Sequence, residues 1–270
     1  MKSILTHLGN DSGLETRLQA ALDIARATGG HLTGISVTPI ASFIGFDPLG
    51  GIYIPQSVFD EIYEIEAQTR SNFESRLAHE DVSWTYLSAN DQVSSSLITH
   101  AALNDLIVLS RPCESDRKIA PSSTIADVLM GSPSPVLVMP EGHIGFDAQG
   151  AAAIGWNGSF EAANALRAAL PLLRHAKSVT LVSVEEAKED RFPLTTASEY
   201  LSRHGVRSDL VTQSPGSAPV DEALLHAASD CQADYLVMGA FGHSRAREFW
   251  LGGVTRSLLQ SAPLPILFGR

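Results

Sequence analysis

The sequence contains little cysteine and has fewer basic than acidic residues. Two cysteines, Cys113 and Cys231, stand in unrelated contexts among 270 residues, so they predict neither a disulfide framework nor a thiolate metal site. Lysine and arginine number 19 against 30 aspartates and glutamates, which gives a formal net charge of -11. Because binding to nucleic acid or to an anionic membrane surface needs clustered positive charge, we expect neither partner.

The sequence also has no uninterrupted apolar run that approaches membrane-spanning length. The first residues lead directly into a strand pattern at residues 2–8 and show no signal-peptide core. We therefore expect a cytoplasmic protein. The hydrophobic content of 44% is ample for buried cores, and the length suits two domains.

Apolar periodicity predicts alternating strands and helices in both halves of the chain. In the first half we expect strands at 2–8, 31–38, 82–88, 105–110 and 135–139, and helices at 14–28, 57–79, 93–103 and 122–130, with Ser57 as an N-cap. In the second half we expect strands at 151–156, 178–184, 206–213, 235–238 and 266–268, and helices at 161–175, 194–204, 220–231 and 254–264. This alternation predicts an α/β fold whose parallel sheets are covered by helices on both faces.

An internal repeat divides the chain. Residues 18–22, Leu-Gln-Ala-Ala-Leu, match residues 166–170 at an offset of 148, while residues 133–137 match residues 263–267 at an offset of 130. The difference, 148 minus 130, is 18 residues, close to the length of a proline- and glycine-rich segment at 39–56 that has no counterpart in the second half. We predict domains at residues 1–142 and 150–270.

The stretch from Tyr235 to Thr255 combines an apolar strand, a glycine-rich loop and the start of a helix. Its sequence, YLVMGAFGHSRAREFWLGGVT, has the spacing Gly-x2-Gly-x9-Gly, which is neither a Walker nor a Rossmann pattern. Glycines let the backbone approach an anion closely, and the N-terminus of the following helix presents free N–H groups. Arg245 and Arg247 add positive charge inside the loop. The stretch therefore predicts a phosphate site.

This motif, with its flanking residues Asp234-Tyr-Leu-Val-Met-Gly and Ala262-Pro-Leu-Pro-Ile-Leu-Phe, resembles the nucleotide-binding signature of the universal stress protein family. The order of strands and helices in both halves resembles that family too. The resemblance implies two tandem domains of the adenine nucleotide alpha hydrolase-like fold, each with an open five-stranded parallel sheet. It also implies that ATP, or the related ADP or AMP, lies at the carboxyl ends of the second domain's strands. The implied binding residues are Asn157, Val184, Met238, Gly239, Gly242, Arg245, Gly252, Gly253, Val254 and Thr255.

Two positions of the second half depart from the family pattern. Gly253 stands where the family usually has Ser or Thr, which removes a hydroxyl but keeps the backbone N–H, and Thr255 is a nearby substitute. Asn157 stands where the family often has Asp, so a charge that could help to hold Mg²⁺ is missing. Magnesium dependence is left open.

The first half has lost the glycines of the loop. By alignment on the second half, Ser110, Cys113, Ser122 and Ser123 replace Gly239, Gly242, Gly252 and Gly253, and two acidic residues, Glu114 and Asp116, lie in between. Negative charge and missing glycines both oppose a bound phosphate. We therefore expect no nucleotide in the first half.

Three functional hypotheses remain, and the first is favoured. In it the protein is a regulatory, stress-response nucleotide-binding protein with no catalytic residue, no protein metal site and little or no hydrolysis. In the second it is a slow ATP hydrolase or phosphoryl-transfer enzyme that uses His243 with Arg245 and Arg247. In the third it is a nucleotide-free interaction scaffold. The resemblance also implies that the two domains pack as an intramolecular pseudo-dimer through their last strands and Pro-x-Pro segments, and it leaves a homodimer open.

Overall fold

The computed structural model describes residues 1–39, 45–46, 52–53, 56–113, 122–184, 192–214, 216, 218–240 and 253–270. The first half contains strands β1 (Ser3–His7), β2 (His31–Val37), β3 (Gly45–Phe46), β4 (Ile52–Tyr53), β5 (Ser83–Ala89), β6 (Leu106–Ser110) and β7 (Val136–Met139). Its helices are α1 (Leu14–Thr28), α2 (Gln56–Leu77), α3 (Val93–Ala101) and α4 (Ser122–Gly131).

The second half repeats this alternation. Its strands are β8 (Ala151–Gly155), β9 (Ser178–Val184), β10 (Asp209–Gln213), β11 (Tyr235–Gly239) and β12 (Ile266–Gly269). Its helices are α5 (Phe160–Leu173), α6 (Leu194–Arg203), α7 (Val220–Asp230) and α8 (Gly253–Ser261).

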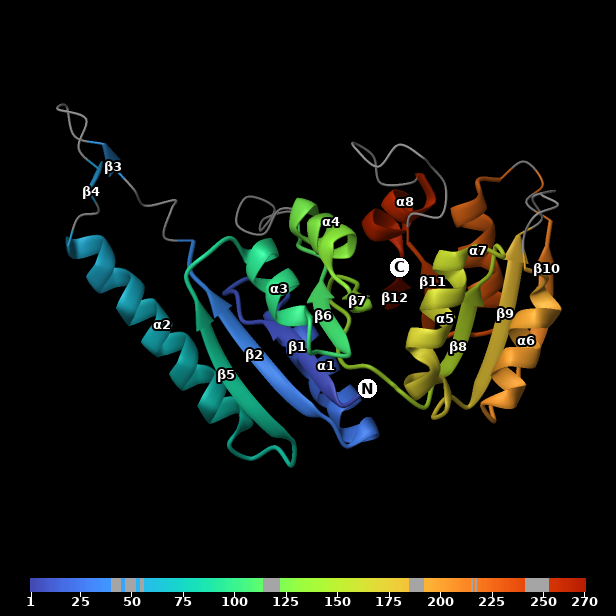
Figure 1. Ribbon diagram of the computed structural model, residues 1–270, viewed down its shortest axis with the longest axis horizontal. Coiled ribbons are helices and arrows are strands. Elements are labelled where there is room, and N and C mark those ends of the chain that lie inside the picture. The colour runs from blue at the N-terminus through green and yellow to red at the C-terminus, as the bar shows by residue number, and fades with distance from the viewer. Residues whose placement is uncertain are drawn as a thin grey trace.

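Ten of these strands form one continuous sheet, in the order β10-β9-β8-β11-β12-β7-β6-β1-β2-β5 (Figure 1). Each half contributes five parallel strands, and the two sets meet where β7 pairs with β12 in antiparallel orientation. At the centre of this seam Leu137 lies opposite Leu267, and these residues are equivalent under the offset of 130. The last strand of each half is therefore covered by its counterpart, and neither presents an open edge.

Helices cover both faces of the sheet. In the first half α1 and α2 pack on one face and α3 and α4 on the other; in the second half α5 and α6 share a face, and α7 and α8 lie opposite. The apolar core is correspondingly split into two layers, and each layer runs through both halves. Leu22 of α1 and Leu166 of α5 belong to one layer, and Leu97 of α3 and Leu258 of α8 belong to the other.

The predicted α/β fold class, with its open parallel sheets, is confirmed. Two local details differ from the prediction. A short antiparallel pair, β3–β4, forms within the proline- and glycine-rich segment, for which the sequence analysis predicted no strand or helix. Helix α2 begins at Gln56, so Ser57 lies inside the helix and is not its N-cap. Figure 1 shows α2 as a long helix beside β5, with β3 and β4 beyond its first residues. No helix in the described part of the chain is long and apolar enough to cross a membrane.

Candidate functional site

The topology creates one switch point in each half. In the second half β8 and β11 are parallel neighbours, and the chain that leaves β8 continues to β9 on one side while the chain that leaves β11 continues to β12 on the other, so the two connections diverge at the carboxyl ends of β8 and β11. In the first half β1 has the same position between β2 and β6. Ligands of open α/β sheets bind in the crevice at such a point.

The turn after β8 is fixed by its own side chains. The Asn157 Oδ1 accepts a hydrogen bond of 3.1 Å from the Ser159 backbone N–H, and Gly158 between them has a positive φ of 73°. The Ser159 hydroxyl then caps α5 by accepting from the Ala162 N–H at 3.1 Å. These bonds place the exposed Asn157 at the carboxyl edge of the sheet.

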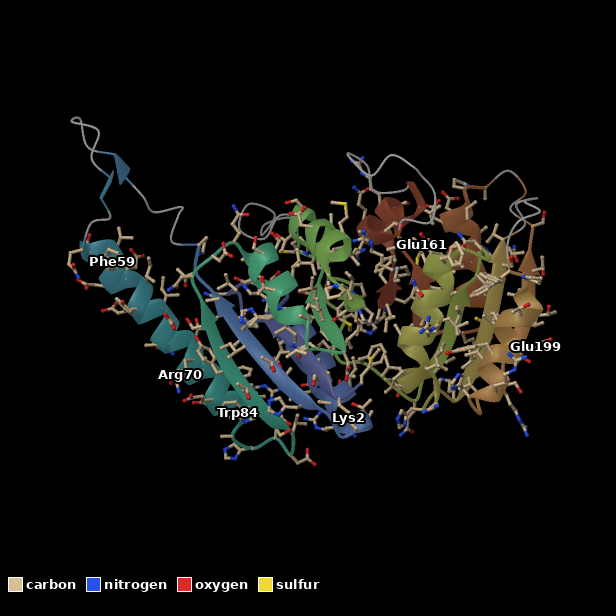
Figure 2. All side chains as sticks on the ribbon, viewed as in Figure 1. Lys2, Phe59, Arg70, Trp84, Glu161 and Glu199 are labelled. Carbon is tan, nitrogen blue, oxygen red and sulfur yellow. The ribbon has the colours of Figure 1, made fainter. Side chains whose placement is uncertain are left out.

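Gly239 ends β11 beside the first turn of α5. A Cβ at this position would lie 2.5 Å from the Ala162 backbone nitrogen and 2.6 Å from the Glu161 carbonyl carbon. Figure 2 shows Glu161 at the upper end of α5. The close approach that the structure gives to Gly239 is thus to a helix backbone, which is a packing reason for this glycine in addition to the predicted phosphate contact.

Gly253 has a different environment at the start of α8. A Cβ there would have no heavy atom of the described residues within 4 Å, so nothing in the described part of the chain crowds the helix N-terminus. Thr255 and Leu258 form the buried face of this helix, and Val254 is half-buried. The first N–H groups of α8 have no partner within the helix, which is the property an anion site uses.

The structure brings several predicted binding residues to one edge of the sheet. Asn157, Val184 and Gly239 follow or end three neighbouring strands, and Met238 is buried beside them, at 7% exposure. Gly253, Val254 and Thr255 form the first turn of α8. Gly242, Arg245 and Gly252 lie outside the described residues, as do His243 and Arg247. Among the described residues no cluster of His, Cys, Asp or Glu is placed to hold a metal ion.

The sequence analysis missed a cluster of three aromatic residues at this edge, formed by Trp156, Phe160 and Phe192. The Trp156 indole N–H donates to the Phe192 carbonyl at 3.0 Å, and the Phe192 N–H donates to the Gly158 carbonyl at 3.2 Å. The rings of Phe160 and Phe192 meet edge to face with centroids 5.8 Å apart, and Phe160 remains 75% exposed. Trp156 and Phe160, which flank the turn at Gly158, were the available signal, but Phe192 is 36 residues from Trp156, and this separation hides their contact in the sequence.

The first half fills its switch point with a buried ion pair. Both terminal nitrogens of Arg17 contact the Asp11 carboxylate, at 2.6 and 2.9 Å, and the two side chains are 3% and 7% exposed. Arg17 also donates to the His7 and Gly9 carbonyls, at 2.6 and 2.7 Å, and to the Ser110 hydroxyl at 3.0 Å. The guanidinium therefore joins the ends of β1 and β6 across the crevice.

His7 is also part of this cluster, and its imidazole has a strongly lowered pKa. Burial, followed by the positive charge of Arg17, lowers the pKa of His7 to about 3, although Asp11 opposes the shift. Its buried Nε2 has no hydrogen-bond partner among the described residues. The cavity that remains beside His7, Asp11 and Arg17 has a volume of about 40 Å³, too small for a nucleotide.

The second half has none of these charges at the equivalent positions. Arg17 corresponds to Ala165 at the offset of 148, and His7 corresponds to Gly155. Ala165 is fully buried and lies against the last glycine of β12, since a Cβ on Gly269 would be 2.3 Å from the Ala165 Cα. The two switch points therefore differ in chemistry although their folds repeat.

Comparison with known proteins identifies a family domain in the second half of the chain. The model of the universal stress protein family matches residues 153–270, the range that holds the open switch point. Residues 153–270 therefore carry a universal stress protein domain. The resemblance seen in the sequence is thereby confirmed. No curated protein matches the chain significantly.

Solved structures extend the likeness of fold to the whole chain. A universal stress protein from Archaeoglobus fulgidus DSM 4304 superposes with a TM-score of 0.72 at 15% identity, with 98% of each chain covered. A functionally unknown protein from Pseudomonas aeruginosa PAO1 gives a TM-score of 0.63 at 16% identity, covering 99% of this chain and 92% of that one. The cytoplasmic domain of a prokaryotic cation chloride cotransporter gives 0.50 at 14% identity, covering 99% and 94%. At these identities the likeness concerns the fold alone.

Proposed function

We propose that this chain is a cytoplasmic stress-response protein that binds one adenine nucleotide, ATP or a relative of it, in its second half. The observation that carries the proposal is the difference between the two switch points. No atom of the described residues crowds the N-terminus of α8 at Gly253, whereas in the first half Arg17 and Asp11 fill the crevice at the end of β1. One site per chain follows.

The described residues fit such a ligand. Phosphate groups would lie against the first turn of α8, where the amides and the positive end of the helix dipole favour an anion. The base would lie toward Asn157 and Val184, at the ends of β8 and β9. Gly242, Arg245 and Gly252 complete the proposed set on sequence grounds.

We propose that the nucleotide is a regulatory ligand and that hydrolysis is slow or absent. Of the proposed contacts, Asn157, Val184 and Thr255 have side chains that do not ionise near neutral pH, so none can act as a general base. Asn157 supplies no charge for a metal, and its Oδ1 already accepts from Ser159. Any Mg²⁺ would therefore be held chiefly by phosphate oxygens.

We further propose that residues 1–142 and 150–270 are two domains that pack as an intramolecular pseudo-dimer. Antiparallel pairing of the equivalent residues Leu137 and Leu267 supports this arrangement, because a local two-fold axis places equivalent residues opposite each other. A homodimer of the whole chain would need a surface other than β7 and β12.

The first test is mass spectrometry of small molecules released from the denatured protein, followed by titration with ATP, ADP and AMP with and without Mg²⁺. Recovery near one nucleotide per chain, or a melting temperature raised by one of the three, is the expected result, since a ligand of the native state stabilises it.

A matched pair of variants then locates the site. Gly253→Asp places a carboxylate at the start of α8, where no described atom crowds it, and should lower nucleotide affinity at least tenfold by repulsion. Ser123→Asp places the same charge at the start of α4 and should leave affinity unchanged, since Ser123 is exposed and equivalent to Gly253. Equal affinity in both variants would contradict the site, and a protein that binds none of the three nucleotides would favour the scaffold hypothesis.

A further inference from the structure

A second candidate site lies in the first half, between α1 and α2. The two helices leave an open groove of about 540 Å³. This volume falls within the range of about 300–1,000 Å³ that small-molecule sites occupy. The groove is far larger than the 40 Å³ cavity at the first-half switch point, and its lining does not include Arg17 or Asp11.

The groove exists because two corresponding parts of the chain differ. In the second half the position equivalent to Leu8 is Trp156, whose indole is 6% exposed and bonds to Phe192, next to the start of α6. Trp156 and Leu8 belong to the same apolar core layer. Leu8 has a much smaller side chain, and its partner helix α2 has 22 residues where α6 has 10. The first half therefore has a smaller side chain and a longer helix beside the groove than the second half has at the equivalent positions.

The floor of the groove is apolar, because Leu8, Leu18 and Phe73 of its lining are buried. Leu14 and Ile65 are the other apolar residues of the lining. Phe73 is held in place by an edge-to-face contact with Trp84, with ring centroids 5.5 Å apart, and it is 4% exposed. Ile65 on α2 is 55% exposed, so its side chain is left largely uncovered. Such a floor favours a ligand with an apolar body.

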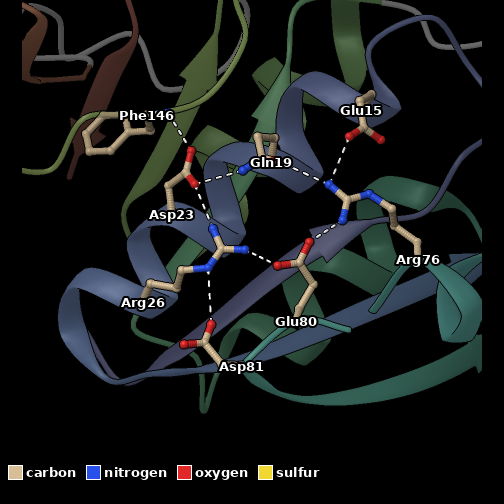
Figure 3. Close-up of polar contacts among 8 residues, drawn as sticks. All are labelled: Glu15, Gln19, Asp23, Arg26, Arg76, Glu80, Asp81 and Phe146. Carbon is tan, nitrogen blue, oxygen red and sulfur yellow. Dashed lines mark hydrogen bonds and ion pairs between the residues drawn. The ribbon is translucent and has the colours of Figure 1, made fainter. Parts of the chain in front are cut away.

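The charged groups that line the groove are Glu15, Glu64 and Arg76. Arg76 is committed to neighbouring groups: it contacts Glu80, Gln19 at 2.9 Å and Glu15 at 3.2 Å (Figure 3). The hydrogen bond to Glu80 is the main cause of the raised pKa of Arg76. Glu64 has no ion-pair partner among the described residues. The lining has two carboxylates and one guanidinium, and that guanidinium is also paired with Glu80, which does not line the groove. The lining therefore carries a net negative charge.

We propose that the groove between α1 and α2 binds a small amphipathic organic cation. The apolar body of the ligand lies on the leucines and Phe73, and its protonated amine lies near Glu64 and Glu15. An anionic amphiphile is disfavoured because it would have to break the contacts of Arg76 with Glu15 and Glu80. Binding here is separate from nucleotide binding in the second half.

The test uses the full chain and the neutral fluorescent dye N-phenyl-1-naphthylamine. The dye should bind the wild-type protein, and decylamine should displace it at lower concentration than decanoate. Glu64→Gln should weaken displacement by decylamine about two- to fivefold, as expected for one partly exposed carboxylate, and should leave dye binding unchanged. ATP titration should give the same affinity with and without decylamine.

Three variants locate the ligand. Leu8→Trp copies the second half and should abolish dye binding by filling the groove. Ile65→Arg, at an exposed position, should repel decylamine, and it decides the question if the tryptophan variant does not fold. Leu103→Arg is the matched control, because Leu103 is 91% exposed and does not line the groove. Unchanged dye and decylamine binding in Ile65→Arg would overturn the site, and equal displacement by decanoate would overturn the cationic ligand class.

Discussion

Gly13 and Ser110 make the crossing of α1 over the end of β6 possible, because a Cβ on Gly13 would lie 2.2 Å from the Ser110 hydroxyl oxygen. The equivalent crossing in the second half reverses the two roles. Gly13 corresponds to Glu161 and Ser110 to Gly239, so the glycine is on the helix side in one half and on the strand in the other. In each half there is room for only one side chain where the helix crosses the end of the strand. The first glycine of the phosphate motif is therefore required for packing, whatever else it does.

This relationship predicts that Gly239→Ala destabilises the protein. The added methyl would overlap the Ala162 backbone nitrogen, which cannot move as a side chain can, so we expect a loss of about 1–3 kcal/mol in the free energy of unfolding. Gly253→Ala is the control, since its Cβ would meet no heavy atom of the described residues within 4 Å, and it should change stability by no more than about 0.5 kcal/mol. Urea denaturation of both variants measures the difference. Equal stability would mean that the crossing is not tightly packed.

Much of the fold could be predicted because apolar periodicity is a local property of the chain. Helix α1 begins and ends where its spacing predicts, from Leu14 to Thr28. The short β3–β4 pair could not be predicted, since each strand has two residues and shows no period. The glycine loop indicated where a site should lie, but three of its proposed residues fall outside the described part of the chain.

The buried ion pair had a signal in the sequence that was not used. Arg17 stands three residues after Leu14 and one before Leu18, on the apolar face of α1. A charged residue on a buried face needs a partner of opposite sign. Its partner Asp11 lies only six residues earlier, in the turn before the helix, so the conformation of that turn decides whether the two side chains meet.

A double-mutant cycle should show strong coupling between Arg17 and Asp11. Either single change, Arg17→Ala or Asp11→Ala, leaves one buried charge without its partner, so each should destabilise the protein by about 3–5 kcal/mol. The double variant should lose less than the sum of the two, because no isolated charge remains. As a control, the exposed pair Arg203 and Glu199, at 71% and 64% side-chain exposure, should show coupling below about 1 kcal/mol. Additive losses at Arg17 and Asp11 would show that the pair does not act as a unit.

His7 should make the stability of the protein depend on pH below neutrality. Its pKa is about 3 in the folded protein and about 6.5 in an unfolded chain, so between these values the unfolded state binds a proton that the folded state does not. The contribution is fully present above about pH 6.5 and is lost as the pH falls, by about 1.4 kcal/mol per pH unit. Unfolding free energies of the wild type and His7→Leu at pH 7, 6 and 5 measure this slope. The variant should lose less stability over this range, and parallel curves would place the titration elsewhere.

Gly253→Ser should increase nucleotide affinity if phosphate groups lie at the start of α8. The change restores the hydroxyl expected from family resemblance, and among the described residues no heavy atom lies within 4 Å of a Cβ at Gly253. A hydrogen bond from a hydroxyl to a charged phosphate contributes about 1.5 kcal/mol, which corresponds to roughly a tenfold gain in affinity. Gly253→Ala adds the carbon without the hydroxyl and should leave affinity near the wild-type value. Calorimetric titration of the three proteins separates the effects: a gain in the serine variant alone indicates a hydrogen bond, whereas an equal gain in both variants would point to stabilisation of the helix. No gain in either would mean that the phosphates lie away from this turn, and the proposed nucleotide position would then have to move toward Asn157.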